Sequence, residues 1–293
     1  MSYANFIPNV WSEGINRELE RLCVFVEDCN TNYEGNVKKK GESVTILGVG
    51  KPTIKRIAKA ARNNDIDGPE EVEDTSIVMY INQIAYFNYM VGDIDKAQSV
   101  DGVMDALSQE TSEGLANEVD KHIAEKAVDT SVKALYGTTP VKVVAYEPTA
   151  EQAEAGEKYV LDVMDEAIQA LYENDVSTNT HIVTTVSPRF FTLFKKAYIK
   201  TDTNNSAMLK NGKVAMYGNV TVKMSNNVHK TENGTVDNIM VRTKRAIAFA
   251  KPVTHTEAYR PEKKFADAVK GFILFDSKVV RPKEVLNMNV KYK

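Results

Sequence analysis

The run Gly48-Val-Gly-Lys-Pro-Thr53 is the first segment whose residue types could do chemistry, because glycine-rich loops followed by lysine bind phosphates. A phosphate-binding loop also needs a glycine at position 45 and a serine or threonine at position 52. This chain has Thr45 and Pro52 there. We therefore predict a kink in an extended hairpin at this point, and not a nucleotide site.

Glu118, His122 and Glu125 would share one face of a helix, a spacing that could place carboxylate and imidazole ligands around a metal. A di-metal helical bundle needs a second such pair and two further glutamates on partner helices, and the sequence has no second pair. We therefore predict that His122 is a surface or interface residue. No serine occupies a nucleophile elbow, so the sequence predicts no catalytic residue, no metal, no cofactor and no enzyme. The remaining histidines lack ligand-like spacing: His181, His229 and His255.

The two cysteines, Cys23 and Cys29, match neither a zinc motif nor a redox motif, and we predict that both are core thiols. The chain has 293 residues, of which 43% are hydrophobic and 26% charged, as in ordinary globular proteins. No apolar run approaches the roughly 18 residues that span a bilayer, and the N-terminus lacks the regions of a signal peptide. We expect a protein of the reducing cytosol that does not enter membranes.

Charge is distributed unevenly along the chain, whose net charge is −3. Residues 239–293 contain thirteen Lys and Arg against five Asp and Glu, a net of +8, so the remainder carries −11. Such asymmetry is typical of oriented surfaces, although solvated faces without a partner give the same pattern. The basic C-terminal quarter could contact nucleic acid, but it lacks the clustered arginines and interleaved aromatics of single-strand binders.

A long helix is predicted over residues 100–135. Ser99 can cap its start, apolar or small residues recur at every fourth position from Val103 to Ala127, and Gly137 follows its expected end. Such a helix would be roughly 50 Å long, which exceeds a compact domain, so other elements must lie against it. Its carboxylates predict an acidic outer face: Asp101, Asp105, Glu110, Glu113, Glu118, Asp120, Glu125 and Asp129.

A projecting hairpin is predicted over residues 33–94, with β-rich limbs at residues 43–47 and 75–91 and a charged tip that turns at Asp67-Gly-Pro69. The first half of the tip is basic and the second half is acidic. These charges could pair across the hairpin, where exposed ion pairs contribute about 0–1 kcal/mol each, or they could dock on an adjacent subunit. Both interpretations remain open.

The other expected elements alternate between helices and strands. Residues 6–11 (Phe-Ile-Pro-Asn-Val-Trp) predict an extended arm, residues 12–22 a short helix and residues 24–26 a strand-like stub. A capping box at Thr149 and Gln152 predicts a helix to about Tyr172, and Ser187-Pro188 predicts a helix over residues 189–199. Strands are predicted at residues 181–186, 214–217, 220–224, 247–250, 271–275 and 279–280, with a hairpin turn at Asn233-Gly234.

A series of short motifs runs along nearly the whole chain. It begins with Phe6-Ile-Pro-Asn-Val-Trp11, Asn32-Tyr-Glu-Gly35 and Gly41-Glu-Ser-Val-Thr45, and it continues with Val91-Gly-Asp-Ile-Asp95, Gln98, Glu118-Val-Asp120, Val186-Ser-Pro188, Gly218-Asn-Val, Ser225-Asn-Asn227, Arg260, Gly271 and Arg281-Pro282. Each motif is weak alone. Their order and spacing together resemble the major capsid proteins of tailed bacteriophages.

The resemblance implies the Hong Kong 97 fold, an α+β architecture with an N-terminal arm, an extended β-hairpin loop, a peripheral domain with a long spine helix, and an axial domain. In this chain the arm would be residues 1–32, the extended loop and peripheral strands 33–98, the spine helix 99–140 and the axial domain 141–244. Residues 245–293 would return to the peripheral domain as closing strands. Arm and loop would contact neighbouring copies through Phe6, Ile7, Trp11, Lys51, Lys55, Arg56, Lys59, Arg62, Glu70, Glu71, Glu73 and Asp74.

The implied function is structural. Copies of the chain would assemble as pentamers and hexamers into the icosahedral head of a tailed bacteriophage, located in the virion and enclosing double-stranded DNA. A separate scaffolding protein and a portal would take part in assembly in the host bacterial cytoplasm. Two alternatives remain open: an encapsulin-like compartment, which has the same fold and encloses a cargo protein, and a soluble nucleic-acid-binding protein.

Overall fold

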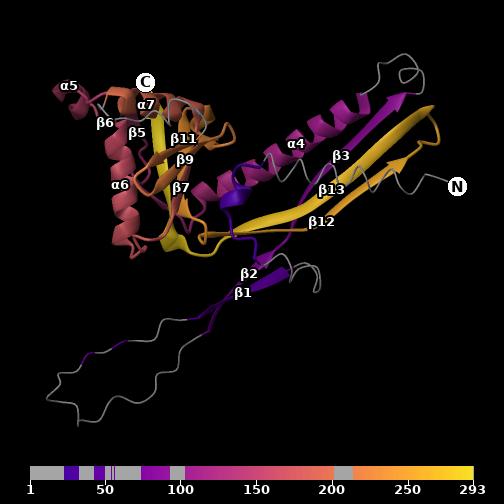
Figure 1. The fold of residues 1–293 in the computed structure, drawn as a ribbon, viewed down its shortest axis with the longest axis horizontal. Helices are drawn as coiled ribbons and strands as arrows, with labels where there is room; N and C mark the ends of the chain where they lie inside the picture. The colour runs from indigo at the N-terminus through magenta and orange to yellow at the C-terminus, as the bar shows by residue number, and fades with distance from the viewer. Residues whose placement is uncertain are drawn as a thin grey trace, which may run out of the picture.

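The computed structural model describes residues 23–32, 43–49, 54, 56, 74–92, 103–200 and 214–292. These residues form a long helix against a three-stranded sheet at one end of the molecule, and a larger sheet with shorter helices at the other end (Figure 1). A two-stranded hairpin extends from the junction between the two ends. The mixture of helices and separate sheets confirms the predicted α+β class.

The three-stranded sheet has the order β12-β13-β3, from strands β12 (Ile247–Tyr259), β13 (Ala266–Val279) and β3 (Gln83–Gly92), all antiparallel. Helix α4 (Val103–Glu125) lies along this sheet (Figure 1). The helix buries a face at the expected three- and four-residue spacing, which includes Leu115, Val119 and Ile123.

Gly271 in the central strand β13 is required by a close approach. A Cβ atom at this position would lie 2.6 Å from the Phe87 ring on β3 and 2.6 Å from the carbonyl oxygen of His255 on β12. The aromatic ring therefore occupies the space that a side chain would fill, and the glycine allows three strands to pack closely.

The long helix is shorter at its C-terminal end than predicted. It ends at Glu125, a 3₁₀ turn spans Lys126–Val128, and β4 (Lys133–Ala134) follows and pairs in parallel with a strand of the larger sheet. The Asp129 carboxylate accepts hydrogen bonds from the backbone N–H and the hydroxyl of Ser131, at 2.9 and 2.8 Å. This local turn competes with helix, so the predicted continuation to residue 135 was wrong.

The larger sheet has nine strands. Its main path is β6-β5-β14-β11-β7-β9-β8, and β10 and β4 pair with β11 and β14 at the side. The strands not yet given are β5 (Val141–Val144), β6 (Glu157–Tyr159), β7 (Ile182–Val186), β8 (Val214–Tyr217), β9 (Val220–Met224), β10 (His229–Thr231), β11 (Val236–Thr243) and β14 (Val285–Tyr292). Helices α6 (Val160–Glu173) and α7 (Pro188–Lys200) accompany the sheet, and a short helix α5 (Ala150–Glu154) precedes β6.

Several local signals in this region are confirmed. The Ser187 hydroxyl accepts a hydrogen bond from the backbone N–H of Phe190 at 3.3 Å and so caps α7 as predicted. The Gln152 side chain accepts a hydrogen bond from the Thr149 N–H at 3.0 Å, which completes the predicted capping box. Asn233 turns the hairpin between β10 and β11 with a φ of 56°.

The helix expected from Thr149 to about Tyr172 is divided in two. Gly156 has a φ of 77°, a left-handed conformation that ends α5, and residues 157–159 then form β6 beside β5. Helix α6 restarts at Val160 and buries the predicted apolar face, including Val163, Met164 and Leu171. The capping box therefore opens only a short helix.

Strand β14 was not predicted, and it lies between β5 and β11 inside the larger sheet. The sequence division placed residues 245–293 together as closing strands of the peripheral domain. Strand β13 does pair with β3, and β12 pairs with β13, whereas β14 pairs with strands from residues 141–243. The domain limits themselves stay a prediction.

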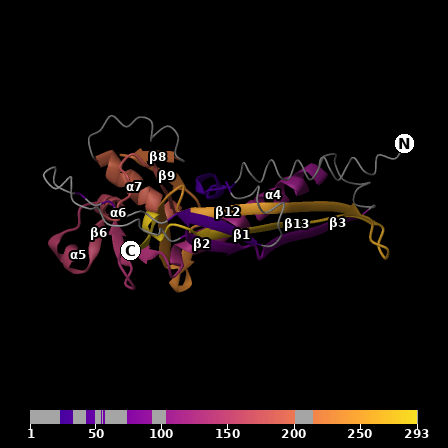
Figure 2. The same cartoon turned by 90° about the horizontal axis from the view of Figure 1, so that it is seen from below.

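The base of the predicted hairpin is confirmed. Strand β1 (Ser43–Val49) pairs antiparallel with β2 (Asp74–Tyr80), from Ser43 opposite Tyr80 to Val49 opposite Asp74. Val44 and Ile46 are buried against Ala248 of β12, and Figure 2 shows the hairpin base beside β12 and β13. The predicted kink at residues 50–53 and the turn at 67–69 lie outside the described residues. None of the described helices is both long and apolar enough to cross a membrane.

Candidate functional site: the anchor of the N-terminal segment

Residues 23–32 form the base of the predicted arm, and they are fixed to the body of the molecule. The predicted strand-like stub at residues 24–26 is wrong, because the segment bends and then forms a 3₁₀ turn at Val26–Asp28. Asn30 next bridges to β12: its N–H donates to the Ile247 carbonyl at 2.9 Å, and its carbonyl accepts from the Phe249 N–H at 3.0 Å. Backbone pairing thus holds one end of the segment.

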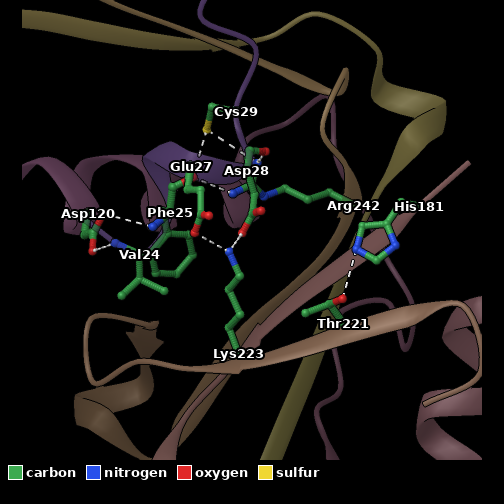
Figure 3. Close-up of polar contacts among 10 residues, drawn as sticks. All are labelled: Val24, Phe25, Glu27, Asp28, Cys29, Asp120, His181, Thr221, Lys223 and Arg242. Carbon is green, nitrogen blue, oxygen red and sulfur yellow. Dashed lines mark hydrogen bonds and ion pairs between the residues drawn. The ribbon is translucent and has the colours of Figure 1, made fainter. Parts of the chain in front are cut away.

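Asp120 of helix α4 holds the other end (Figure 3). Its carboxylate accepts hydrogen bonds from the backbone N–H groups of Val24 and Phe25, at 2.9 and 3.1 Å, and the residue is only 1% exposed. Burial raises the pKa of Asp120 from 3.8 to about 6, while the two N–H donors and the Arg242 guanidinium oppose that rise. Asp120 therefore does not belong to the acidic outer face predicted for this helix.

Arg242 of β11 approaches the same segment from the opposite side (Figure 3). Its guanidinium donates to the Phe25 carbonyl at 2.9 Å, to the Asp28 carbonyl and to the Cys29 sulfur at 3.4 Å, and Arg242 is 1% exposed. Burial raises the pKa of the Cys29 thiol, which donates to the Phe25 carbonyl. The prediction that Cys23 and Cys29 are core thiols is confirmed.

Lys223 of β9 supplies a third contact. Its ammonium group lies 2.7 Å from an Asp28 carboxylate oxygen and 2.8 Å from one of Glu27. Burial opposes the charge of Lys223, but the hydrogen bonds to Asp28 and Glu27 prevail and raise its pKa. The same contact lowers the pKa of Glu27. Nearby, the His181 ring and the Thr221 hydroxyl are hydrogen-bonded at 2.9 Å (Figure 3).

The arrangement is suited to mechanical attachment. Side chains of three elements bind one short segment. Asp120 of α4 accepts from two of its backbone N–H groups, Arg242 of β11 donates to three of its acceptors, and Lys223 of β9 pairs with two of its carboxylates. Among the residues that the structure describes, no group of three or more His, Cys, Asp or Glu side chains could hold a metal ion. The cluster fixes the position of residues 23–32 on the body of the molecule.

A second polar junction lies on the other side of α4. His122 is within 3.0 Å of an Asp276 carboxylate oxygen on β13 and packs edge-on against Phe275. The other Asp276 oxygen accepts the Asn82 N–H at 3.2 Å, between β2 and β3. His122 therefore joins elements within the chain, and an interface role for this partly exposed residue stays a prediction. Glu118, its expected companion, instead pairs with Lys121 at 2.7 Å.

Most of the predicted contact residues cannot be compared with the structure. Arg56 is exposed, and Asp74 begins β2 opposite Val49. The others lie outside the described residues: Phe6, Ile7, Trp11, Lys51, Lys55, Lys59, Arg62, Glu70, Glu71 and Glu73. Sequence reasoning missed Asp120 and Arg242, although Asp120 falls on the buried helix face next to Val119, a position where a carboxylate needs partners.

Strand β3 and its neighbour β13 present large exposed apolar side chains on the side of the three-stranded sheet opposite α4, beside an ion pair between Lys270 and Glu257. Alternate residues of β3 point to that side, and Ile84, Tyr86 and Met90 are 60%, 80% and 50% exposed. Phe272 of β13 lies opposite Tyr86 in register and is also exposed. Large exposed apolar patches are rare on monomeric proteins, and where they occur they usually mark interaction surfaces.

No protein-family model matches the sequence, and no curated protein sequence matches it. Solved structures match closely in fold. A structure from Mycobacterium phage Che8 has a TM-score of 0.66 and 24% identity, and the match covers 90% of each chain. The capsid of Cyanophage P-SCSP1u has a TM-score of 0.61 and 18% identity, with 87% of this chain and 84% of that chain covered.

A third similar structure is a virus-like particle from Pyrococcus furiosus, with a TM-score of 0.55 and 9% identity. This match covers 98% of the present chain and 100% of the other. These matches extend over most of the length of each chain. The chain therefore has the Hong Kong 97 fold of phage capsid proteins.

Proposed function

We propose that this chain is the major capsid protein of a tailed bacteriophage, a structural protein that assembles into an icosahedral head around double-stranded DNA. The observation that carries the proposal is the likeness to capsid structures over about nine-tenths of the chain. The function is inferred from this fold likeness by analogy. The exposed face of the three-stranded sheet and the anchor of residues 23–32 supply independent support.

The open apolar face of the three-stranded sheet supports assembly. Tyr86 and its apolar neighbours are exposed to water in an isolated subunit. Burial of such a side chain in an interface would stabilise the assembly by about 1.5–3 kcal/mol. Identical copies that bury this face against one another would close into a shell when the contact is repeated by symmetry. Interfaces of this type draw much of their energy from aromatic anchors.

The anchor of residues 23–32 supports the same proposal. Because the segment is fixed at Asp120, Arg242 and Lys223, the residues before Cys23 start from a defined point on every copy. In the proposed shell, residues 1–32 act as the arm, 33–98 as loop and peripheral strands, 99–140 as the spine helix and 141–244 as the axial domain. A fixed starting point gives the arm a reproducible reach to a neighbour.

The other partners belong to the proposal as well. Copies would gather as pentamers and hexamers in the host bacterial cytoplasm, aided by a separate scaffolding protein and a portal. Packaged DNA would be contacted without sequence specificity. The exposed carboxylates Glu110, Glu113 and Glu118 of α4 would repel DNA if this helix faces the lumen.

Electron microscopy of the expressed protein in negative stain tests the proposal. Closed, uniform shells with icosahedral outlines are the expected result. A protein that stays monomeric at high concentration, with or without a scaffolding protein from the same genome, would contradict it. Arg245→Ala, an exposed substitution away from the sheet face, serves as a control variant that should assemble normally.

A second candidate is a compartment that encloses protein cargo, favoured by the likeness to the virus-like particle from Pyrococcus furiosus. The two candidates predict different contents. Nuclease-protected DNA in particles from the native source indicates a phage head, whereas a stoichiometric second protein without DNA indicates a compartment.

A further inference from the structure

The free edge of β3 is the feature that the proposed function does not yet use. In the described part of the chain, β3 pairs with β13 alone, so the other edge of this ten-residue strand leaves backbone N–H and C=O groups unpaired. Figure 2 shows β3 at one margin of the three-stranded sheet. Such an edge is a template for a further strand.

Soluble proteins usually protect a free edge with lysine, proline or a bulge. The opposite margin of the same sheet has all three: β12 contains Lys251 and Pro252, and its pairing with β13 shifts between Ala250 and Val253. Asn30 also covers part of β12. By contrast, β3 (Gln-Ile-Ala-Tyr-Phe-Asn-Tyr-Met-Val-Gly) has no charged residue and no proline. The edge of β12 is thus protected against pairing with a further strand, and the edge of β3 is not.

A groove runs beside the unprotected edge, between β3 and α4. Its volume is about 610 Å³, and residues 83–87 of β3 form one wall from both faces of the strand. Leu115 and Phe275 contribute apolar surface, and Glu118 and Glu125 of α4 lie at the other wall. A strand laid along the edge would therefore pair its backbone with β3 and bury alternate side chains in the groove.

We propose that the edge of β3 receives residues 6–11 of a second copy of this chain as an added antiparallel or parallel strand. This inference rests on the proposed shell function. The segment suits the site because it is uncharged, like the edge, and contains Phe6, Ile7 and Trp11, which match the apolar part of the groove at Ile84, Tyr86 and Phe87. It lies within the 22 residues that precede Cys23, and an extended chain of that length spans about 70 Å, enough to reach a neighbouring subunit.

Pro8 determines which alternate residues of the added strand can pair with β3. Proline has no N–H to donate, so it fits an edge strand only where its nitrogen points away from the partner. Residues 6, 8 and 10 then turn their backbone nitrogen outward, and Ile7, Asn9 and Trp11 donate to β3. Because side chains alternate with the same period, only every second residue of the segment can approach Tyr86 on one face of the sheet.

Disulfide trapping between two differently tagged chains tests this geometry. One chain carries Tyr86→Cys, and the other carries a single cysteine at each of positions 6 to 11 in turn. The chains are assembled together, oxidised and separated on a non-reducing gel. We expect links between chains at alternate positions only. Chains without an added cysteine report any background from Cys23 and Cys29.

The outcomes are separable from those of the shell proposal. Normal particles without links, or with equal links at all six positions, would overturn the strand pairing and leave the shell standing. A third chain that carries both cysteines serves as a control. If the link forms within that chain and never between chains, the chain's own arm fills the edge, which also overturns the second-copy assignment. Absence of particles from the unmodified chain would instead defeat the shell proposal.

A matched pair of charge substitutions adds a second measurement. Tyr86→Lys places a charge at the unprotected edge, and Ala258→Lys places one on β12, whose edge already has charges. Both positions are exposed, so neither change should unfold the subunit. We expect the yield of particles to fall about tenfold for Tyr86→Lys and to stay within about twofold for Ala258→Lys. Equal yields would contradict the assignment.

Discussion

The two sheets of the molecule differ in how completely the chain covers them. In the nine-stranded sheet, every residue of β7 and β11 is buried, so both faces are covered by the chain itself. In the three-stranded sheet, α4 covers one face. The residues of β3 alternate between partly buried ones on that face and exposed ones on the other. The first region is complete within one subunit, whereas the second has surface left for neighbours.

The contacts of polar side chains also differ between the anchor at residues 23–32 and the open face of β3. The segment at residues 23–32 has its charges matched by Asp120, Lys223 and Arg242, at the boundary between α4 and the larger sheet. On the open face of β3, Asn88 accepts a hydrogen bond from the Tyr259 hydroxyl at 3.2 Å, and the large side chains on either side of it are exposed. Substitutions at the anchor should therefore act on folding of the subunit, and substitutions on the face should act on assembly.

The largest effect is expected for Arg242→Ala. The substitution leaves the buried Phe25 and Asp28 carbonyls without a donor and opens a cavity, so the free energy of unfolding should fall by about 3–5 kcal/mol. Urea denaturation of unassembled subunits measures this change. Arg245→Ala, at an exposed ion pair with Glu284, should change it by less than about 0.5 kcal/mol. Equal losses for the two variants would show that the anchor adds no special stability.

The pH dependence of Asp120 comes next. Because its pKa is raised from 3.8 to about 6, the folded state binds this proton more tightly than the unfolded chain does. Its contribution to stability is fully present below the unfolded pKa and is lost as the pH rises through about 6. Relative to Asp120→Asn, the native protein should lose about 2–3 kcal/mol of unfolding free energy between about pH 4 and pH 7. Parallel stability curves for the two proteins would contradict this.

Gly271→Ala should have a smaller effect of about 1–3 kcal/mol, because the added methyl group would collide with the Phe87 ring and the His255 carbonyl. Gly114→Ala is the matched control, since no atom lies within 4 Å of its added Cβ and the residue is in helix α4. That variant should be more stable by about 0.5–1 kcal/mol. Thermal unfolding of both variants checks the opposite signs, and a shift in the same direction would refute the close-approach explanation.

Tyr86→Ser should have the smallest effect on the subunit. Tyr86 is 80% exposed, so the free energy of unfolding should change by no more than about 0.5 kcal/mol. The same variant should nevertheless give fewer particles by light scattering and electron microscopy. A large loss of subunit stability would mean that the open face already serves the isolated chain.

Local signals in the sequence predicted the elements that depend on local structure. The cap at Ser187, the turn at Asn233 and the repeating apolar face of α4 were all identified correctly, because their determinants lie within a few residues. Element ends were less accurate: the Asp129 turn and the left-handed Gly156 both stop a helix whose apolar pattern continues.

The anchor could not be predicted in this way. Asp120 meets Val24 across 96 positions of sequence, and Arg242 meets Phe25 across 217. Nothing near either residue specifies that distant partner, and a charged residue in a helix or strand pattern usually indicates an exposed position. Strand β14 was missed for a related reason, since its asparagines interrupt an apolar pattern and are satisfied only by other strands and turns, as at Asn287 with Asn238 and Asn289 with Gly137.

The position of β14 also affects the timing of folding during synthesis. Val285–Tyr292 lies in the middle of the larger sheet, paired in parallel with β5 and antiparallel with β11. Among the strands that the structure describes, β5 and β11 are therefore joined in one sheet only through β14. A ribosome adds about 5–20 residues per second, and β5 therefore waits for many seconds before its partner strand has been made. A nascent chain cannot complete this sheet early, which delays the formation of an assembly-competent subunit until nearly all of the described chain has left the ribosome.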